Sequence, residues 1–294
     1  MHAETFAEWL TLQGHRVIKS AGSYWYDQGP RAFQAFPYHH LITPGAREVK
    51  ELLLNEKALC IRFSAPMDSG MGAKSYHMTY EKPGYELRML DRRSRQNIRK
   101  GLDQCRIEPI SLERFAEEGF DLEADTVRRQ GRNLTISRSG WRKKFLSASS
   151  LPGFEAWGAL VEGELGATIF TFQMEDWCYM LHAQCHRRYL PLRINNALSY
   201  VVTKTMMERE GVKSVFYSLH SLDAASSVDE FKLRMGYTPK PVLQCVAFHP
   251  CLALFLHPFT HRILARLVRK YPGKGFLSKS EGLLRFYLKS THRL

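Results

Sequence analysis

Two side chains that can exchange protons follow a predicted strand in the last third of the sequence. Residues 212–219 alternate between apolar and polar side chains, which predicts a β-strand with Tyr217 on its apolar side. His220 comes directly after this strand, and Asp229 lies in the segment that closes the same region. Histidine and carboxylate side chains can act as general acids or bases, so both residues are candidates for proton transfer.

A second group of residues, 187–196, has the composition of a phosphate-binding segment. It joins a predicted strand to a predicted helix and reads Arg-Arg-Tyr-Leu-Pro-Leu-Arg-Ile-Asn-Asn. The guanidinium groups of Arg188 and Arg193 can neutralise phosphate. Asn195 can cap the helix that follows, and Asn196 completes the candidate donor-binding set. The segment contains no glycine, so a purely structural turn is the alternative interpretation.

Strands and a helix must position these residues. Residues 156–161, 165–173 and 177–185 are rich in aromatic and β-branched residues and are separated by short polar turns. This pattern predicts an antiparallel meander. From Ile194 to Met206, apolar residues recur at the spacing of one helical face. Strands mixed with helices in this order predict an α/β fold.

This order of elements, closed by Phe231-Lys-Leu-Arg-Met-Gly236, resembles the acyltransferase half of the GNAT superfamily. Two further motifs resemble the FemAB-like branch, in which two GNAT-like halves are fused. Arg92-Arg-Ser-Arg-Gln-Asn-Ile-Arg-Lys-Gly101 is similar to the basic helix of that family. Val127-Arg-Arg-Gln-Gly-Arg132 resembles the segment that opens its second half. The resemblance spans residues 25–240 and implies two mixed α/β halves that are fused; a basic helical extension follows them.

The resemblance implies an N-acyltransferase that moves an acyl group from an activated donor to an amine acceptor within a ternary complex. The donor would be an acyl-CoA or an acyl-carrier protein, used as a co-substrate and not as a tightly bound cofactor. The resemblance also places Lys232 near the transferred acyl group and lets Phe231 shape the pocket. A buried salt bridge with Asp229 or Glu230 is the alternative role for Lys232.

The missing glycines in residues 187–196 depart from the pattern of acetyl-CoA enzymes and leave other donors open. An aminoacyl-tRNA-dependent transferase that acts on a cell-wall precursor or a peptide is the first alternative. Such relatives often carry a long helical arm in the second half, for which this chain has no room.

Aromatic residues near the N-terminus supply further candidates. Residues 22–45 predict an irregular stretch that contains Tyr24 and Trp25. Aromatic walls with a few polar groups are typical of ligand sites, whereas loop packing on the core is the alternative. With Phe231, Tyr217 and Arg99 of the basic helix, these residues make up the candidate substrate-binding set. Solvation at the surface is the alternative role for Arg99.

The net charge of +13, from 42 basic and 29 acidic residues, is concentrated in three segments. Residues 91–100 hold five basic and one acidic residue, residues 127–145 hold seven basic and none acidic, and residues 251–294 hold nine basic and one acidic. Such a field attracts an anionic partner, namely a CoA pyrophosphate, an acyl-carrier protein, a tRNA or anionic lipid. A non-catalytic GNAT-like module that binds nucleic acid or a membrane through these clusters is the alternative for the whole chain.

The chain is predicted to divide into three parts. Residues 1–108 form the N-terminal GNAT-like half, residues 109–248 form the C-terminal half with the donor-binding loop, and residues 249–294 form a basic amphipathic extension. We expect residues 252–271 to pack on the second half through an apolar face that consists of Phe255, Phe259, Ile263 and Leu267. Peripheral contact with a membrane is the alternative for this helix.

Several other chemistries are not predicted. The sequence has no run of 18 apolar residues and no secretory signal. Its six cysteines lack C-x-x-C spacing and suit reduced thiols, so we expect a cytoplasmic protein. His182, Cys185 and His186 would point to different faces of a strand, so no metal site is predicted. Residues 68–75 lack the spacing of a P-loop.

Overall fold

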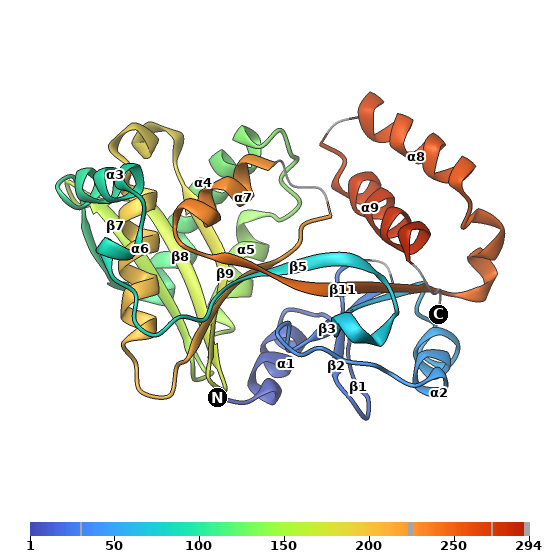
Figure 1. Ribbon diagram of the computed structural model, residues 1–294. Helices are drawn as coiled ribbons and strands as arrows, with labels where there is room; N and C mark the ends of the chain where they lie inside the picture. Colours follow the sequence, from blue (N-terminus) through green and yellow to red (C-terminus); the bar gives the residue numbers. More distant parts are fainter. Residues whose placement is uncertain (30, 223–225, 272, 291–294) are drawn as a thin grey trace. The chain divides into compact units, whose positions relative to one another are not determined.

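The computed structural model describes residues 1–29, 31–222, 226–271 and 273–290. The chain divides into two compact units, each assembled from separate stretches of sequence (Figure 1). Unit 1 comprises Met1–Thr5, Met78–Ser218 and Ala225–Thr238, and unit 2 comprises Phe6–His77, Leu219–Ala224 and Pro239–Leu294. The predicted boundary between two sequential halves near residue 108 stays a prediction, because the contacts that define the two units do not test whether each half is GNAT-like.

Unit 1 contains the predicted meander. Its strands lie in the order β10-β9-β8-β7-β6. They are β6 (Arg106–Ile110), β7 (Phe154–Val161), β8 (Glu164–Met174), β9 (Trp177–Cys185) and β10 (Ser214–Leu219). Strands β6 to β9 are antiparallel, and β10 runs parallel to β9. Between β7 and β8, Glu162 and Gly163 both have positive φ, of 51° and 86°, which gives the backbone twist of a tight hairpin turn.

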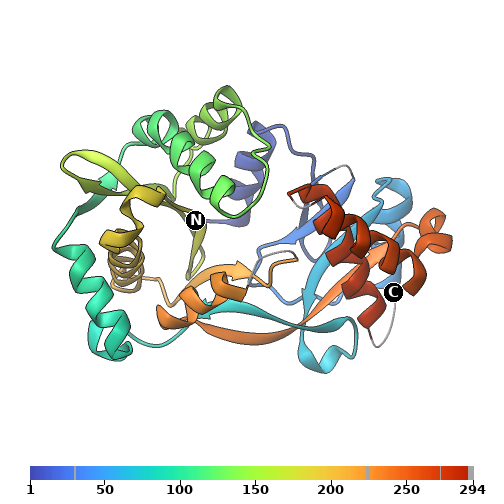
Figure 2. The same cartoon turned by 90° about the horizontal axis from the view of Figure 1, so that it is seen from above.

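Helices cover both faces of these strands. They are α3 (Arg92–Leu102), α4 (Leu112–Arg129), α5 (Arg138–Leu146), α6 (Ile194–Met207) and α7 (Ser226–Arg234). Helices α4 and α5 lie on one side of the strands, and α6 with α3 lies on the other (Figure 2). Phe115 of α4 and Phe145 of α5 pack on Phe170 of β8, with ring centroids 5.5 and 4.9 Å apart. This aromatic cluster fixes α4 and α5 against the sheet.

The basic helix α3 packs closely on α6. Asp91 caps α3, because its carboxylate accepts the backbone N–H of Ser94 at 2.9 Å. Gly101 permits the contact, since a Cβ at this position would lie only 2.5 Å from the carbonyl oxygen of Arg193. The last turn of α3 therefore touches the beginning of α6.

Unit 2 has a strand order of β1-β2-β3-β4-β11-β5. The strands are β1 (Val17–Lys19), β2 (Tyr24–Asp27), β3 (Ala32–Phe36), β4 (Cys60–Ala65), β5 (Ala73–Tyr80) and β11 (Thr238–Phe248). Strands β3 and β4 are parallel, whereas the β1–β2, β2–β3 and β4–β11 pairs are antiparallel. Strands β5 and β11 contribute residues to both units.

The hairpin β2–β3 corrects the prediction of an irregular stretch over residues 22–45. Adjacent residues of both strands are buried, as for Trp25 and Tyr26 in β2. A strand that is covered on both faces shows no alternation of apolar and polar residues, and so it escapes a pattern search. Leu87–Met89 form a short 3₁₀ helix before α3.

The remaining helices of unit 2 are α1 (Ala3–Leu12, whose first residues belong to unit 1), α2 (Ala46–Lys50), α8 (Pro258–Lys270) and α9 (Gly275–Lys289). Helix α9 packs on the unit through Phe286, which joins Ala73 and Val246 in one buried cluster. Helix α8 packs on α9. The basic helical extension is thus part of the fold of unit 2.

The predicted packing face of α8 was wrong. Phe255, Phe259, Ile263 and Leu267 are 60%, 64%, 42% and 37% exposed. The helix contacts α9 through its opposite side, where His261 Nε2 donates to Glu281 Oε1 at 2.7 Å. An amphipathic pattern identifies two faces of a helix but does not say which of them meets the core.

In the described part of the chain, every helix is too short or too polar to cross a membrane. All six cysteines are free thiols, and four of them, Cys60, Cys178, Cys185 and Cys245, are buried.

Candidate active site

Three of the predicted site residues meet in a pocket of unit 1, where β9 and β10 separate. The two strands pair from Ser214 opposite Trp177 to Phe216 opposite Tyr179. Next to these pairs lies a pocket of about 330 Å³, lined by residues of α4, β8, β9, α6, β10 and α7. Asn195, Tyr217 and Phe231 are the predicted residues among them. The volume suits a small ligand or part of a larger one.

The pocket wall contains two groups whose protonation is fixed by burial. Burial raises the pKa of the Tyr217 hydroxyl to about 12, so the hydroxyl keeps its proton and can donate a hydrogen bond. Burial also raises the pKa of the Cys185 thiol to about 12. A thiol in this state is a poor nucleophile, so the wall does not favour a covalent acyl-cysteine.

Ser199 of α6 also lines the pocket, although no sequence motif marked it. The residue is 1% exposed, and its hydroxyl has no hydrogen-bond partner among the described residues. A buried hydroxyl without a partner costs free energy, on the order of 1–3 kcal/mol, unless something else satisfies it. The sequence signal was a serine at a buried helical position between Leu198 and Val202.

The predicted donor loop leads from β9 into α6. Its 3₁₀ segment η4 (Arg187–Leu192) is anchored to α4, because Asp125 accepts the backbone N–H of Arg187 at 2.8 Å and its Nε at 2.6 Å. Burial alone would raise the pKa of Asp125, but these hydrogen bonds outweigh it and hold the pKa below its usual value. The loop is therefore held in one conformation next to the pocket.

The two candidate phosphate-binding arginines of this loop, Arg188 and Arg193, are exposed. Arg188 donates to Glu164 at 3.0 Å and lies over the ring of Tyr189. Arg193 is the residue before the first turn of α6 and has a positive φ of 65°. Its side chain makes no capping bond, and Asn195 lies inside the first turn, so the predicted cap by Asn195 was wrong. Asn196 is buried beside the sulfur of Met235.

Lys232 takes the salt-bridge alternative. Its side chain is 5% exposed, and Nζ donates to Asp229 Oδ1 at 2.9 Å and to Ser218 Oγ at 2.8 Å. The ammonium group also lies over the ring of Tyr217, 5.4 Å from its centroid. These contacts tie α7, which carries Phe231, to the end of β10. A direct contact of Lys232 or Asp229 with substrate stays a prediction.

His220 belongs to unit 2, and its described contacts lie there. Its Nδ1 is 3.2 Å from Ser75 Oγ, and its ring stacks on Tyr76 at 4.3 Å. Its backbone carbonyl accepts a hydrogen bond from Arg62 at 3.0 Å. The role of His220 in proton transfer stays a prediction.

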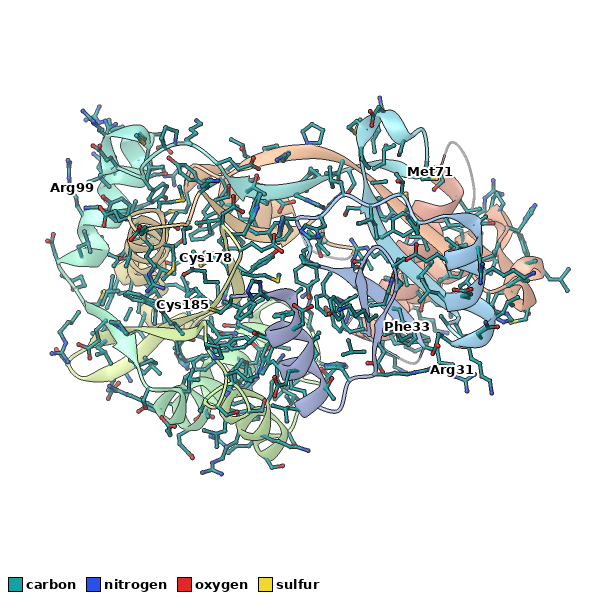
Figure 3. All side chains as sticks on the ribbon, turned by 90° about the horizontal axis from the view of Figure 1, so that it is seen from below. Arg31, Phe33, Met71, Arg99, Cys178 and Cys185 are labelled. Atoms are coloured by element: carbon teal, nitrogen blue, oxygen red, sulfur yellow. The ribbon has the colours of Figure 1, made fainter. Side chains whose placement is uncertain are left out.

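The aromatic candidates of unit 2 occupy different environments. Trp25 is fully buried in the core, and its Nε1 donates to Ser20 Oγ at 2.9 Å. Tyr24 is partly exposed and stacks on Phe36 at 5.3 Å. Arg99 lies on the exposed face of α3 in unit 1, whereas Cys178 and Cys185 point into the interior of that unit (Figure 3). Their parts in substrate binding stay predictions.

A polar network behind the pocket was missed by sequence reasoning. Gln184 lines the pocket, accepts from Thr168 at 2.9 Å and donates to Glu123 at 3.2 Å. Nearby, Lys144 Nζ lies 3.0 Å from His182 Nε2. Burial is the larger cause, and the positive charge of Lys144 the smaller one, that hold the pKa of His182 well below its usual value. The ring is therefore neutral and accepts this hydrogen bond.

Lys144 makes the stability of the fold dependent on pH. Burial lowers its pKa from 10.5 to about 8, and the charge of Glu123 opposes this shift. Between pH 8 and 10.5 the unfolded chain binds more protons at Lys144 than the folded chain does, so the contribution of Lys144 to the free energy of unfolding rises with pH.

We expect the difference in free energy of unfolding between the wild type and Lys144→Met to change by ~2 kcal/mol over this interval, in favour of the wild type. Urea unfolding at several pH values measures it. Lys143→Met, an exposed neighbour, serves as the control, and parallel stability curves for wild type and Lys144→Met would contradict the prediction.

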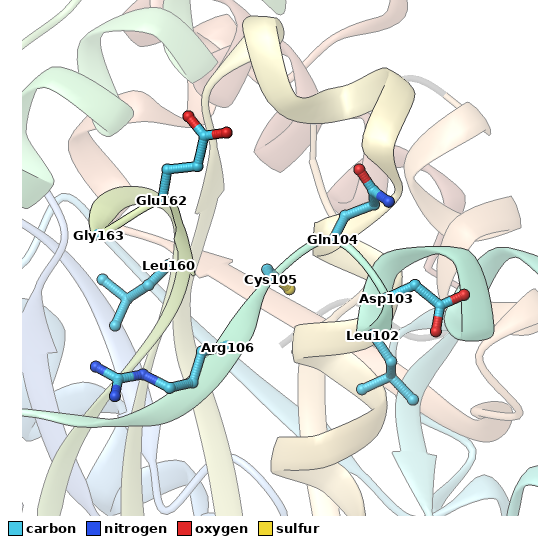
Figure 4. Close-up of a pocket in the computed structure, with 8 residues that line it drawn as sticks. All are labelled: Leu102, Asp103, Gln104, Cys105, Arg106, Leu160, Glu162 and Gly163. Carbon is cyan, nitrogen blue, oxygen red and sulfur yellow. The ribbon is translucent and has the colours of Figure 1, made fainter.

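A second depression of unit 1, of about 500 Å³, lies between the end of α3 and the β7–β8 turn (Figure 4). Arg106, Asp103 and Glu162 are among its lining residues. None of the predicted site residues lies in its wall.

Comparison with known proteins identifies the fold. No family model and no curated protein matches the sequence. Among solved structures, FemX is similar with a TM-score of 0.56 and 11% identity, over 85% of this chain and 92% of that chain. The structure of L-PGS from Bacillus licheniformis is similar with a TM-score of 0.52 and 13% identity, over 90% of this chain and 93% of that chain.

The C-terminal domain of a lysylphosphatidylglycerol synthetase from Agrobacterium fabrum is also similar. Its TM-score is 0.56 at 11% identity, over 82% of this chain and 86% of that chain. At such low identity, these likenesses establish the fold and leave the reaction open. The chain therefore shares the fold of FemX, as the FemAB-like resemblance of its sequence implied.

Proposed function

We propose that this protein is an N-acyltransferase whose pocket between β9 and β10 receives the acyl arm of an activated donor, an acyl-CoA or an acyl-carrier protein. The observation that carries the proposal is the pocket itself, with the buried Ser199 hydroxyl in its wall and the anchored loop beside it. A buried polar group without a partner calls for an explanation, and a bound ligand supplies one.

The shape of the site supports an extended donor. Backbone groups on separating strands can pair with the amides of an extended chain, as in the addition of a strand to a sheet edge. The exposed Arg188 and Arg193 add positive charge beside the start of α6, where they could pair with a phosphate group. A carrier with a phosphate group and an arm that contains amides could pair with the strand edges and with the two arginines.

The reaction needs few groups from the protein. The amine nitrogen of the acceptor bonds to the acyl carbon, the bond from that carbon to sulfur breaks, and the proton lost by nitrogen ends on the leaving thiol. Alignment of the two reactants accounts for much of the acceleration. The protonated hydroxyl of Tyr217 is our candidate donor to the oxygen that becomes negative during the attack.

A second candidate is an aminoacyl-tRNA-dependent transferase. The observation that favours it is the exposed basic face of α3, which packs against α6 and presents Arg92, Arg93, Arg99 and Lys100. Such a face can follow a nucleic-acid backbone. Both candidates place an activated acyl carbonyl in the same pocket and differ in the carrier. In both we propose a cytoplasmic protein with sequential GNAT-like halves.

The carrier is tested on the donor loop. We expect Arg188→Ala/Arg193→Ala to weaken CoA thioester binding about 10- to 100-fold, since hydrogen bonds between charged groups contribute ~1.5–3 kcal/mol each and Arg188 already has Glu164 as a partner. Isothermal titration calorimetry measures this affinity. Arg138→Ala/Arg142→Ala is the matched control, because both of these arginines are also exposed and ion-paired.

Unchanged affinity in the loop variant would remove residues 187–196 from the donor site. A parallel titration with aminoacyl-tRNA separates the two candidates. Loss of tRNA binding in Arg99→Ala/Lys100→Ala, with no CoA thioester binding by the wild type, would establish the second candidate in place of the first.

A further inference from the structure

The outer surface of α8 and of the segment before it is apolar to a degree that a folded unit rarely leaves uncovered. Leu254, Phe255 and Phe259 are 90%, 60% and 64% exposed. We call this the C-terminal surface; it consists of Leu254, Phe255, Phe259, Ile263, Leu267 and Tyr271. The large exposed apolar residues of the described chain concentrate here.

The opposite side of α8 already has its partner. Leu264 and Val268 are partly buried on the side that faces α9, and His261 reaches Glu281 of α9 at 2.7 Å. Helix α9 in turn places Leu284 and Phe286 in the buried part of unit 2. Figures 1 and 2 show α8 on the outer side of α9. The C-terminal surface is therefore left over after α8 has made its contacts with its own unit.

The charges on the same surface are all positive. Residues 249–280 contain no aspartate or glutamate. At 100° per residue, Arg262, Arg266 and Arg269 lie beside Phe259 on the exposed arc of the helix, and Lys270 falls between Phe259 and Ile263. These four basic residues are exposed. Among the described residues, none of the three arginines makes an ion pair, so their charges face solvent.

An apolar stripe bordered by unpaired cationic side chains matches the chemistry of one surface in particular. Aromatic and aliphatic side chains enter the boundary between headgroups and acyl chains, and arginine and lysine meet lipid phosphates. A second copy of the chain would bring like charges together across the same contact, which disfavours self-association.

We propose that the C-terminal surface binds an anionic phospholipid bilayer, with α8 lying in the plane of the interface. Phe255, Phe259 and Ile263 enter the lipid, and Arg262, Arg266, Arg269 and Lys270 contact phosphate groups. This places unit 2 at the surface of a membrane. The proposal is independent of the acyl-transfer chemistry in unit 1.

Sedimentation of the full-length protein with vesicles tests the proposal. We expect binding to vesicles of phosphatidylcholine mixed with phosphatidylglycerol, at least about tenfold tighter than binding to phosphatidylcholine alone, and weakened by salt. Phe255→Ser/Phe259→Ser should lose about tenfold or more in affinity, since each phenylalanine loses its apolar burial. Arg262→Gln/Arg266→Gln should lose about fivefold for each charge removed and become less sensitive to salt.

Leu12→Ser/Met67→Ser is the matched control, since it removes exposed apolar side chains of the same unit outside this surface. It should bind as the wild type does. Because all substituted side chains are exposed, the variants should melt at the wild-type temperature. Absence of binding to the mixed vesicles, or equal binding by all variants, would overturn the proposal. So would lipid-free dimers in analytical ultracentrifugation that disappear in Phe255→Ser/Phe259→Ser, because the surface would then be a contact between copies.

Discussion

Ala183→Phe is expected to lower the affinity for the acyl donor about 100-fold or more, which corresponds to ~3 kcal/mol. Ala183 lies on β9, is exposed and lines the pocket between β9 and β10. A phenyl ring there enters the space that we assign to the donor, while the buried core is not disturbed. The melting temperature should therefore stay close to that of the wild type.

Calorimetry with a CoA thioester and thermal unfolding of the same preparation measure the two effects. Ala21→Phe is the matched control, because it adds the same ring at an exposed position of unit 2. Donor binding by Ala183→Phe at wild-type affinity would mean that the donor lies elsewhere.

Lys232→Met is expected to destabilise unit 1 by ~2–3 kcal/mol. Removing one partner of a fully buried ion pair costs about 3–5 kcal/mol, and here Asp229 keeps 24% of its side-chain exposure, so the cost should be smaller. In a unit of this size, that loss lowers the melting temperature by about 5–10 °C. Arg234→Met is the control, since Arg234 pairs with Glu230 on the same helix but is exposed, and it should have little effect.

The kinetics of Lys232→Met separate two roles of this residue. We propose that Lys232 positions α7, so that Phe231 and Tyr217 keep their places in the pocket wall. KM for the donor should then rise, whereas kcat per folded molecule stays near normal. A fall in kcat of about 10²–10³, the scale of a lost oxyanion donor, with an unchanged melting temperature would instead establish direct contact with the substrate.

The sequence predicted the elements whose periodicity is strong. The meander of β7, β8 and β9 and the helix α6 appear where aromatic, β-branched and helical patterns place them. The hairpin β2–β3 was not predicted, because both of its faces are buried and its sequence therefore does not alternate between apolar and polar residues. The exposure of the apolar face of α8 was not predicted, because a hydrophobic pattern does not show which neighbour a helix packs against.

The site was predicted only in part, for a related reason. Asn195, Tyr217 and Phe231 stood in segments that a family motif or a strand end singled out. Ser199 and Ala183 carry no such mark, because their importance comes from the separation of β9 and β10 and not from their types. Lys232 pairs with Asp229, which was the alternative role predicted for it. A buried lysine needs such a partner, because burying an unpaired charge costs free energy.

Hydrogen–deuterium exchange tests most directly whether the pocket of unit 1 holds the acyl donor. The probe is an acyl-CoA analogue in which a methylene group replaces the thioester sulfur, added to the full-length protein. Protection is expected in residues 183–199 and around Tyr217, and Ala183→Phe should show none of it. Unchanged exchange in these segments, with protection of other segments instead, would contradict the account.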